Sequence, residues 1–556
     1  MTESLPGALA RPEWWRDAVI YQVYPRSFAD ANGDGMGDLP GVISRLDHLV
    51  ELGVDALWLS PFYRSPQHDA GYDVADYRSV DPRFGSLDDA DRLIGEAHAR
   101  GLRVIVDLVP NHTSSEHQWF QAALAAPAGS RERARYLFRD GRGPSGDQPP
   151  NNRQSVFGGP AWTRLIGADG APGQWYLHLF DPTQPDLDWT NPEVRDEFLA
   201  ILRFWLDRGV DGFRVDVTHG LVKADGLPDW DGATHGLVES DETGHRPPMW
   251  DQDAVHEIYR QWHEVLAAYG PDRILCAEAW VSPPARLALY VRPDEMQQAF
   301  NFEYLKTEWA AEDLVHVITN SLTALAAVQA PATWVLSNHD VVRHASRLGL
   351  PDGLTGDGGI GIGDTQPDRE LGLRRARAAT MLLLALPGVA YIYQGEETGL
   401  PEHTTLPDSA RQDPTWTRSG HTVRGRDGCR VPIAWEAAAP AYGFSASGAT
   451  WLPQPDDWAP YAVDSQRGVD GSTYEMYRSA LRLRGQLGLG VGPLTTEEGY
   501  ADGVVALRNA NTVVLTTVGD VKAALPVGHT VLLASGPLDG DTLPPDTTVW
   551  LEAPDA

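Results

Sequence analysis

The chain has 556 residues, 42% of them apolar, and a formal net charge of −32. A single hydrophobic core stops growing at about 250–300 residues, so we expect one large domain with one or two smaller ones. The negative field repels nucleic acid and anionic membrane surfaces and excludes both as expected partners, whereas it leaves an uncharged substrate unaffected.

Cysteine usage and apolar stretches bear on the location of the protein. The two cysteines, Cys276 and Cys429, cannot form a disulfide framework and lack zinc-ligand spacing. The start, MTESLPGALARPEWW, has no apolar segment of the kind found in signal peptides. The longest apolar stretch, Met381–Tyr393, is interrupted by Pro387 and is too short to span a bilayer. We therefore predict a cytoplasmic protein.

Short runs rich in Val, Ile and Leu recur along the chain, each followed by a longer amphipathic stretch. Most of these runs are continuously apolar, which is typical of parallel strands covered on both faces. Eight such strands alternating with helices predict an α/β fold of the (β/α)8 TIM-barrel class. The predicted strands are Ala18–Tyr24, Ala56–Ser60, Val104–Leu108, Gly212–Val217, Ile274–Ala279, Ala299–Phe302, Thr333–Leu336 and Val389–Tyr393.

Amphipathic patterns between these strands predict helices, for example Asp88–Arg100 and Pro192–Arg208. The second pattern has clear start signals, because Asn191 is a suitable N-cap residue and Pro192 fits the first helical position. These helices would cover the outside of the barrel.

The connections between the elements are uneven. Residues 111–180 are polar and rich in Gly and Pro, too long for an ordinary βα loop, and predict a small inserted domain after the third strand. A second insertion, 395–435, follows the eighth strand. Short β-like pieces separated by turns predict a small antiparallel C-terminal domain at 481–556. The barrel is assigned to 1–110 and 181–480.

Polar residues interrupt the apolar strands near their carboxyl ends, where functional residues of this fold collect. Asp107, Asp216, Glu278 and Asp340 each end a separate predicted strand. Arg214 lies two residues before Asp216, on the same face of the strand, so we expect it to keep Asp216 ionised. Glu278 lies among apolar neighbours without an adjacent cation in the sequence, which favours the protonated form that a general acid needs.

Two carboxylates in contrasting surroundings are the arrangement that a retaining glycosidase requires. One attacks the anomeric carbon, and the other protonates the leaving oxygen and then activates water. The alternative interpretation of any single carboxylate is a buried ion pair that holds a loop. Four carboxylates at the ends of separate strands favour a shared catalytic role.

Four segments, DLVPNHT, GFRVDVTHG, AEAW and SNHD, resemble the ordered sequence regions of glycoside hydrolase family 13, the α-amylase family. QPDLDWTNPEV and YQVYPRSFAD are similar to further segments of that family. The resemblance implies a (β/α)8 barrel and retaining chemistry at α-glucosidic bonds. It implies that Asp216 is the nucleophile, Glu278 the acid/base and Asp340 a carboxylate that binds sugar hydroxyls. The residues implied to hold the sugar and the nucleophile are His112, His339 and Arg214.

Within this family the chain is most similar to oligo-1,6-glucosidases, isomaltases and bacterial α-glucosidases, on the segment QHDAGYD. The likeness implies that Asp73 binds hydroxyls of the non-reducing terminal glucose and that Tyr72 stacks on the sugar. Phe180, in YLHLF, resembles an aromatic residue lining the same pocket. Arg426, in GRDGCRVPIAW, resembles an arginine of the same sugar subsite.

The segment DANGDGMGD places oxygen ligands at every second position and resembles an EF-hand loop without its final bidentate Glu. The alternative interpretation is an Asp- and Gly-rich surface turn. Related oligo-1,6-glucosidases hold a structural calcium ion in this loop, so the resemblance implies one structural Ca²⁺, and no organic cofactor is expected. The implied ligands are Asp30, Asn32, Asp34, Asp38 and the carbonyl of Met36.

The leading hypothesis is an exo-acting α-glucosidase that cleaves terminal α-glucosyl residues of short oligosaccharides through a covalent intermediate. In the oligo-1,6-glucosidase group a valine directly after the nucleophile, like Val217, accompanies α-1,6 cleavage. Thr218 and His219 depart from the isomaltase pattern, so α-1,4 and α-1,6 linkages both stay open. The alternatives are a transglucosidase, or a sucrose- or trehalose-active enzyme, with the same double displacement. The sequence leaves the oligomeric state open.

Overall fold

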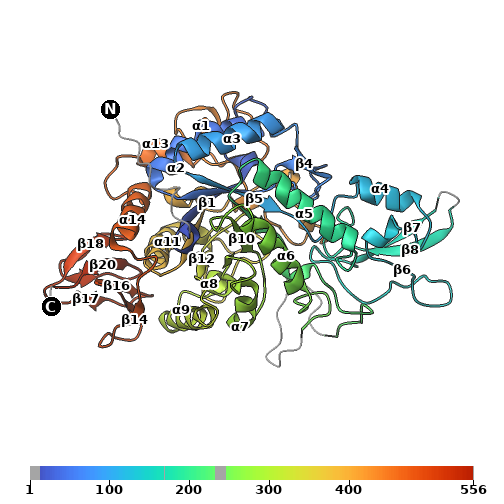
Figure 1. Cartoon of the computed structure of the whole chain (residues 1–556). Helices are drawn as coiled ribbons and strands as arrows, with labels where there is room; N and C mark the ends of the chain where they lie inside the picture. The colour runs from blue at the N-terminus through green and yellow to red at the C-terminus, as the bar shows by residue number, and fades with distance from the viewer. Residues whose placement is uncertain (1–12, 168–169, 232–245, 555–556) are drawn as a thin grey trace.

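The computed structural model describes residues 13–167, 170–231 and 246–554. Its centre is an eight-stranded parallel sheet in the order β11-β10-β9-β5-β2-β1-β13-β12, and a bridge between Phe300 and Thr333 joins the two end strands. The sheet is therefore a closed (β/α)8 barrel, as predicted (Figure 1). Its strands are β1 (Val19–Val23), β2 (Ala56–Leu59), β5 (Arg103–Leu108), β9 (Gly212–Val215), β10 (Ile274–Ala277), β11 (Gln298–Ala299), β12 (Thr333–Val335) and β13 (Val389–Tyr393).

Each predicted barrel strand overlaps an observed one, but six of them end earlier than predicted, and β9, β10 and β11 do so by two or three residues. β9 and β10 stop one residue before Asp216 and Glu278, so both carboxylates lie on the first residue of a loop. The sixth strand ends at Ala299 because Asn301 caps the next helix, α8 (Phe302–Lys306), by accepting a hydrogen bond from the amide of Tyr304 at 2.9 Å.

The predicted outer helices are present and begin with the expected caps. Ser86 forms a capping box with Asp89 at the start of α3 (Leu87–Ala99). Asn191 accepts from the amide of Glu193 at 2.9 Å at the start of α5, which spans Pro192–Asp207. Further long helices are α6 (Val255–Ala267), α9 (Ala311–Ala326), α11 (Arg369–Leu384) and α14 (Thr473–Leu487).

The inserted segment 111–180 contains helix α4 (Gln118–Ala125) and a three-stranded antiparallel sheet in the order β6-β8-β7. This part projects from one side of the barrel, opposite the C-terminal sheet (Figure 1). Its own apolar residues, including Phe157 and Phe180, form a cluster with Val217 and Trp250 of the barrel loops. The small sheet consists of β6 (Phe138–Arg139), β7 (Trp162–Ile166) and β8 (Pro172–Leu177).

After α14 the chain forms an antiparallel five-stranded sheet in the order β14-β15-β16-β20-β18, as the β-like pieces predict. Trp550 and Asn509 attach this sheet to the barrel by donating to the carbonyls of Met381 and Ala385 at 3.1 and 2.8 Å. The strands are β14 (Leu494–Thr496), β15 (Val504–Asn509), β16 (Thr512–Thr517), β18 (Thr530–Ala534) and β20 (Thr548–Glu552), with the separate pair β17 (Ala523–Ala524) and β19 (Thr542–Leu543).

In the described part of the chain, no helix has the length and apolar character needed to cross a membrane. The two cysteines are free thiols and both are buried. The start of the chain, for which no signal peptide is predicted, lies mostly outside the described residues.

Candidate active site

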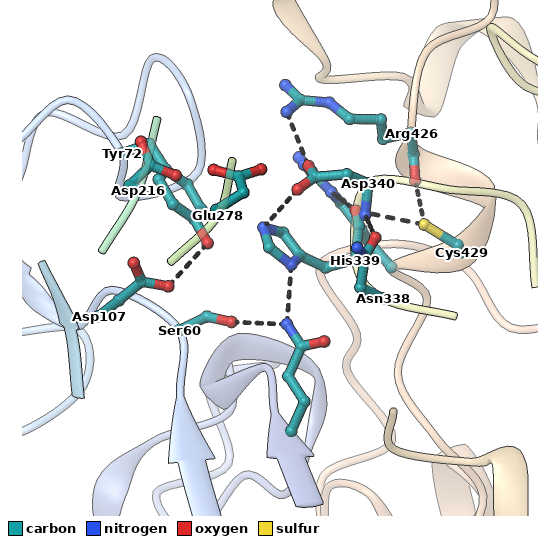
Figure 2. A network of polar contacts seen from close by, with 12 residues as sticks. Ser60, Tyr72, Asp107, Asp216, Glu278, Asn338, His339, Asp340, Arg426 and Cys429 are labelled. Carbon is teal, nitrogen blue, oxygen red and sulfur yellow. Dashed lines mark hydrogen bonds and ion pairs between the residues drawn. The ribbon is translucent and has the colours of Figure 1, made fainter. Parts of the chain in front are cut away.

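A single guanidinium joins the carboxylates predicted to carry the chemistry. Nη1 of Arg214, on β9, lies 2.7 Å from Asp216 Oδ1 and 2.9 Å from Asp107 Oδ1, and its Nη2 lies 2.9 Å from Glu278 Oε2. All four side chains are buried at the carboxyl ends of β5, β9 and β10. Figure 2 shows Asp216 and Glu278 beside each other. The residues proposed as nucleophile and acid/base thus contact the same cation.

Two further donors hold Glu278. The amide of Val217 donates to Oε2 at 2.9 Å, and the indole of Trp280 donates to Oε1 at 3.2 Å. Val217 has a φ of 46°, a left-handed conformation that is unfavourable for a β-branched residue, and this turn directs its N–H to the carboxylate. The expectation that Glu278 has no neighbouring cation is wrong, because Arg214 comes from the adjacent strand of the barrel.

Three carboxylates share this one cation, so the cluster carries excess negative charge. Burial, followed by the charge of Glu278, raises the pKa of Asp216 well above its usual range. Burial also raises the pKa of Asp107 to about 7. Attraction to Arg214 opposes both shifts without outweighing them, which corrects the prediction that Arg214 keeps Asp216 ionised in the free enzyme. Such a cluster retains a proton near neutral pH and titrates as a unit.

Asp340 is surrounded by cations instead. Arg426 Nη1 and Arg430 Nη2 both lie 3.0 Å from its Oδ1, and His339 Nε2 lies 3.2 Å from its Oδ2. Burial acts to raise the pKa of Asp340, but the neighbouring His339, Arg426 and Arg430 hold it below its usual range. Asp340 therefore stays ionised and can accept hydrogen bonds from sugar hydroxyls. Its carboxylate lies near that of Glu278 (Figure 2).

His339 and Tyr72 support each other. The two rings stack at 5.2 Å with an interplanar angle of 4°, and Gln22 Nε2 lies 2.7 Å from Nδ1 of His339. The hydroxyl of Tyr72 donates to Asp107 Oδ2 at 3.1 Å. The prediction that Tyr72 stacks on the sugar is therefore modified, because one face of its ring is already covered by His339.

The predicted role of Asp73 is not supported by its position. Asp73 is fully buried, and its carboxylate accepts hydrogen bonds from Ser65 Oγ at 2.8 Å and from the amides of His68 and Asp69 at 2.8 and 3.1 Å. Asp69 faces the site in its place, because its Oδ1 lies 2.8 Å from Arg426 Nη2. Both aspartates lie in the segment QHDAGYD and both are buried, and the loop conformation decides which of them contacts Arg426.

The inserted segment and Gln184, which follows it, complete the site. Gln184 Nε2 donates to Asp69 Oδ2 at 3.0 Å and lies 3.1 Å from Nε2 of His112. The ring of Phe180 lies 5.2 Å from the ring of His112, and Phe157 lies 5.0 Å from the guanidinium of Arg426. The structure therefore brings His112, Phe180 and Arg426 together, as predicted.

Asp69, Arg430 and Gln184 were missed in the sequence. Arg430 lies four residues after Arg426 in the same segment, separated by the short turn η9 (Asp427–Cys429), and both reach Asp340. Gln184 opens the quoted segment QPDLDWTNPEV. The signal was present in each case, but the sequence does not specify which side chains of a loop point inward.

The Asp- and Gly-rich loop after β1 has the compact form of an oxygen-rich turn. Asp30 accepts from the amides of Gly33 and Gly35, both at 2.7 Å. Asn32 and Asp34 accept from the amides of Asp34 and Met36, both at 2.8 Å. In the part of the chain that the structure describes, no group of three or more His, Cys, Asp or Glu side chains is arranged to hold a metal.

Two carboxylates of this loop are nevertheless buried. Asp30 and Asp38 are 7% and 3% exposed. Burial raises the pKa of Asp38, and the nearby charge of Asp30 adds to the shift. A hard cation would offset both charges, and carboxylate, amide and carbonyl oxygens are the ligands that calcium prefers.

Comparison with known proteins gives consistent matches. Residues 22–489 match the family model described as alpha amylase, catalytic domain. A probable α-glucosidase of Rhizobium meliloti is 39% identical, over 85% of this chain and 82% of the relative. The oligo-1,6-glucosidase of Parageobacillus thermoglucosidasius is 34% identical, over 85% and 84%. The crystal structure of an α-glucosyl transfer enzyme has a TM-score of 0.84 at 35% identity and covers 97% of this chain and 99% of that one.

Proposed function

The chain belongs to the α-amylase family of glycoside hydrolases, and from this premise we propose that it is a retaining, exo-acting α-glucosidase. It hydrolyses terminal non-reducing α-glucosyl residues of short oligosaccharides. The observation that carries this conclusion is the placement of Asp216 and Glu278 on the two arms of one guanidinium, that of Arg214.

The reaction proceeds in two displacements. Asp216 attacks the anomeric carbon while Glu278 gives its proton to the leaving oxygen, so that the aglycone departs as a neutral alcohol and a glucosyl ester forms on Asp216. Glu278, now a carboxylate, removes a proton from water, whose oxygen displaces Asp216 and releases α-glucose. The first step needs Asp216 as a carboxylate, so the proton that the buried cluster retains must lie on Glu278 when the substrate is bound.

The sugar pocket favours one terminal glucose unit. Arg426 forms ion pairs with Asp69 at 2.8 Å and with Asp340 at 3.0 Å, so these charged groups form a continuous wall. Together with His112 and His339 they supply donors and acceptors for several hydroxyls. A wall of this kind suits the non-reducing end of a chain, since a longer glycan could not continue beyond it.

A transglucosidase with the same double displacement is the second candidate. It is favoured by the similarity to the α-glucosyl transfer enzyme and to a trehalulose synthase from Pseudomonas mesoacidophila, which is 28% identical with a TM-score of 0.82. In this alternative a sugar or alcohol takes the place of water in the second step. Val217, directly after the nucleophile, resembles the pattern of α-1,6 cleavage, whereas Thr218 and His219 depart from it, so α-1,4 and α-1,6 links both stay open.

The test is incubation with maltose, isomaltose, sucrose and trehalose separately, with product analysis over time. Release of α-glucose is expected, and Asp216→Asn should lower kcat by on the order of 10⁴-fold. Glu278→Gln should lower kcat by about 10²- to 10⁴-fold. New trisaccharides at high substrate would favour the transglucosidase. Absence of product from all four sugars would contradict both assignments.

We also propose that the protein is cytoplasmic. In addition, we propose that the loop from Asp30 to Asp38 holds one structural Ca²⁺. The ion would tie the loop after β1 without entering the chemistry. We expect chelation to lower Tm by several degrees while kcat at 25 °C is unchanged. Added Ca²⁺, but not Mg²⁺, should restore the original Tm. Equal Tm values with chelator and with Ca²⁺ would contradict this site.

A further inference from the structure

Three buried polar side chains meet where the inserted segment faces the turn after Asp216. Arg153 is 4% exposed, and His219 and Trp250 are both 0% exposed. Among the described residues, Arg153 Nε, both ring nitrogens of His219 and Trp250 Nε1 have no partner in hydrogen-bonding geometry. Buried polar atoms are almost always paired, so a cluster of unpaired ones indicates a partner beyond the part of the chain that the structure describes.

The indole of Trp250 connects the three side chains. His219 stacks on it at 4.9 Å with an interplanar angle of 29°, and the guanidinium of Arg153 lies 5.3 Å from its ring centroid. Arg153 comes from the inserted segment, His219 from the turn η5 (Thr218–Gly220) and Trp250 from the loop before α6. Three separate parts of the chain therefore converge on one place.

This place adjoins the acid/base. Trp250 belongs to the same apolar cluster as Val217, whose amide binds Glu278 at 2.9 Å. Burial lowers the pKa of His219 to about 4, although the charge of Asp251 and the main-chain carbonyl of Glu278 both act to raise it. The ring of His219 is therefore neutral at neutral pH. Since Glu278 protonates the leaving oxygen, the cluster borders the leaving-group half of the substrate.

The guanidinium of Arg153 carries a buried positive charge. Burial lowers the pKa of Arg153 to about 10, so it stays cationic at neutral pH, and within residues 13–167, 170–231 and 246–554 no carboxylate forms an ion pair with it. The carboxylate of Asp251, which influences the neighbouring His219, is already bound by Arg286 at 2.9 Å and by Tyr290 at 2.8 Å. In contrast, the buried Arg484 donates to three main-chain carbonyls.

We propose that Arg153, His219 and Trp250 form a subsite for an anionic group, a carboxylate or phosphate, on the leaving-group half of the α-glucoside. Arg153 supplies the charge and a planar set of donors that matches such oxyanions. Trp250 supplies an N–H, and neutral His219 supplies a third donor. The proposal rests on the proposed α-glucosidase function, because that function makes this side of Glu278 the leaving-group side.

The kinetic test compares 4-carboxyphenyl α-glucoside with its neutral analogue, 4-carbamoylphenyl α-glucoside. Arg153→Gln should lower the ratio of kcat/KM for the anionic to that for the neutral substrate by about 10- to 100-fold, as loss of a charge-assisted hydrogen bond predicts. The matched control is Arg26→Gln, because Arg26 is also buried, at 5% exposure, and lies 4.2 Å over the ring of Trp451. The control should keep the wild-type ratio. An equal ratio in wild type and Arg153→Gln would overturn the proposal.

A binding measurement separates a substrate group from a free anion. Tm is followed with added sodium phosphate or acetate at constant ionic strength, in wild type, Arg153→Gln and Arg26→Gln. Stabilisation lost only in Arg153→Gln, together with the changed kinetic ratio, supports the subsite. The same loss with an unchanged ratio assigns the site to a free anion and overturns its link to the substrate. If neither aryl glucoside is hydrolysed, the proposed function fails, whereas the binding experiment still decides whether Arg153 binds an anion.

Discussion

Asp69 and Asp73 lie four residues apart in one loop, yet their carboxylates have different partners and different roles. Asp73 is enclosed by three donors of its own loop, and burial raises its pKa to about 6. Asp69 instead shares Arg426 with Asp340. One carboxylate therefore fixes the loop and the other presents charge to the pocket.

Substitution of the two aspartates should separate these roles. Asp69→Asn weakens a charge-assisted contact in the pocket, so kcat/KM should fall about 10- to 100-fold with little change in Tm. Asp73→Asn loses acceptors for buried donors, so the free energy of unfolding should fall by about 1–3 kcal/mol. Thermal unfolding and initial rates on one aryl glucoside check both. A catalytic loss in Asp73→Asn without a loss of stability would reverse the assignment.

At the scale of elements, the loops that follow β9 and β10 decide the chemistry. Both strands end one residue before a catalytic carboxylate, and the left-handed Val217 then directs its amide toward Glu278. The strands are rigid because their neighbours pair with them on both sides. The strand ends thus fix the positions of Asp216 and Glu278, whereas the longer insertions supply the rest of the site.

Helix α5 precedes β9 and offers a test of an element by itself. Asn191 accepts from the amide of Glu193 at its first turn. Asn191→Ala should lower the free energy of unfolding by about 0.5–2 kcal/mol, because an orphaned N–H loses its acceptor, while kcat stays at the wild-type value. Asn191→Ser, which keeps a capping oxygen, should recover most of the loss. Denaturant titration measures both, and equal stability of the two variants would contradict a capping role.

At the scale of the whole molecule, the net charge of the surface and the charges of the active site have different roles. The net charge of −32 means that excess acidic side chains repel one another across the surface. In the active site, by contrast, Arg214, Arg426 and Arg430 surround the carboxylates. An uncharged sugar is indifferent to the outer field. The cations of the pocket are therefore needed locally, to balance buried carboxylates.

Salt should stabilise this molecule. Raising NaCl from 0.05 to 0.5 M shortens the screening length to a few ångströms and weakens the repulsion, so we expect Tm to rise by about 1–3 °C. Scanning calorimetry at a fixed pH checks this. A fall in Tm would mean that surface ion pairs such as Arg369 with Asp457 contribute more than net repulsion does.

The sequence alone determined the barrel, because continuous apolar runs separated by amphipathic helices have few other stable arrangements. It also placed Asp216 and Glu278 at strand ends and Asp340 in the loop that follows the seventh strand, since strand position follows from local composition. The tertiary structure decided what neighbouring strands and loops bring together. It placed Arg214 beside Glu278 and brought Asp69, not Asp73, to Arg426. Among the described residues it placed no carboxylate beside Arg153. Such contacts depend on which residues the closed barrel and the inserted segment bring together, and spacing along the chain does not encode them.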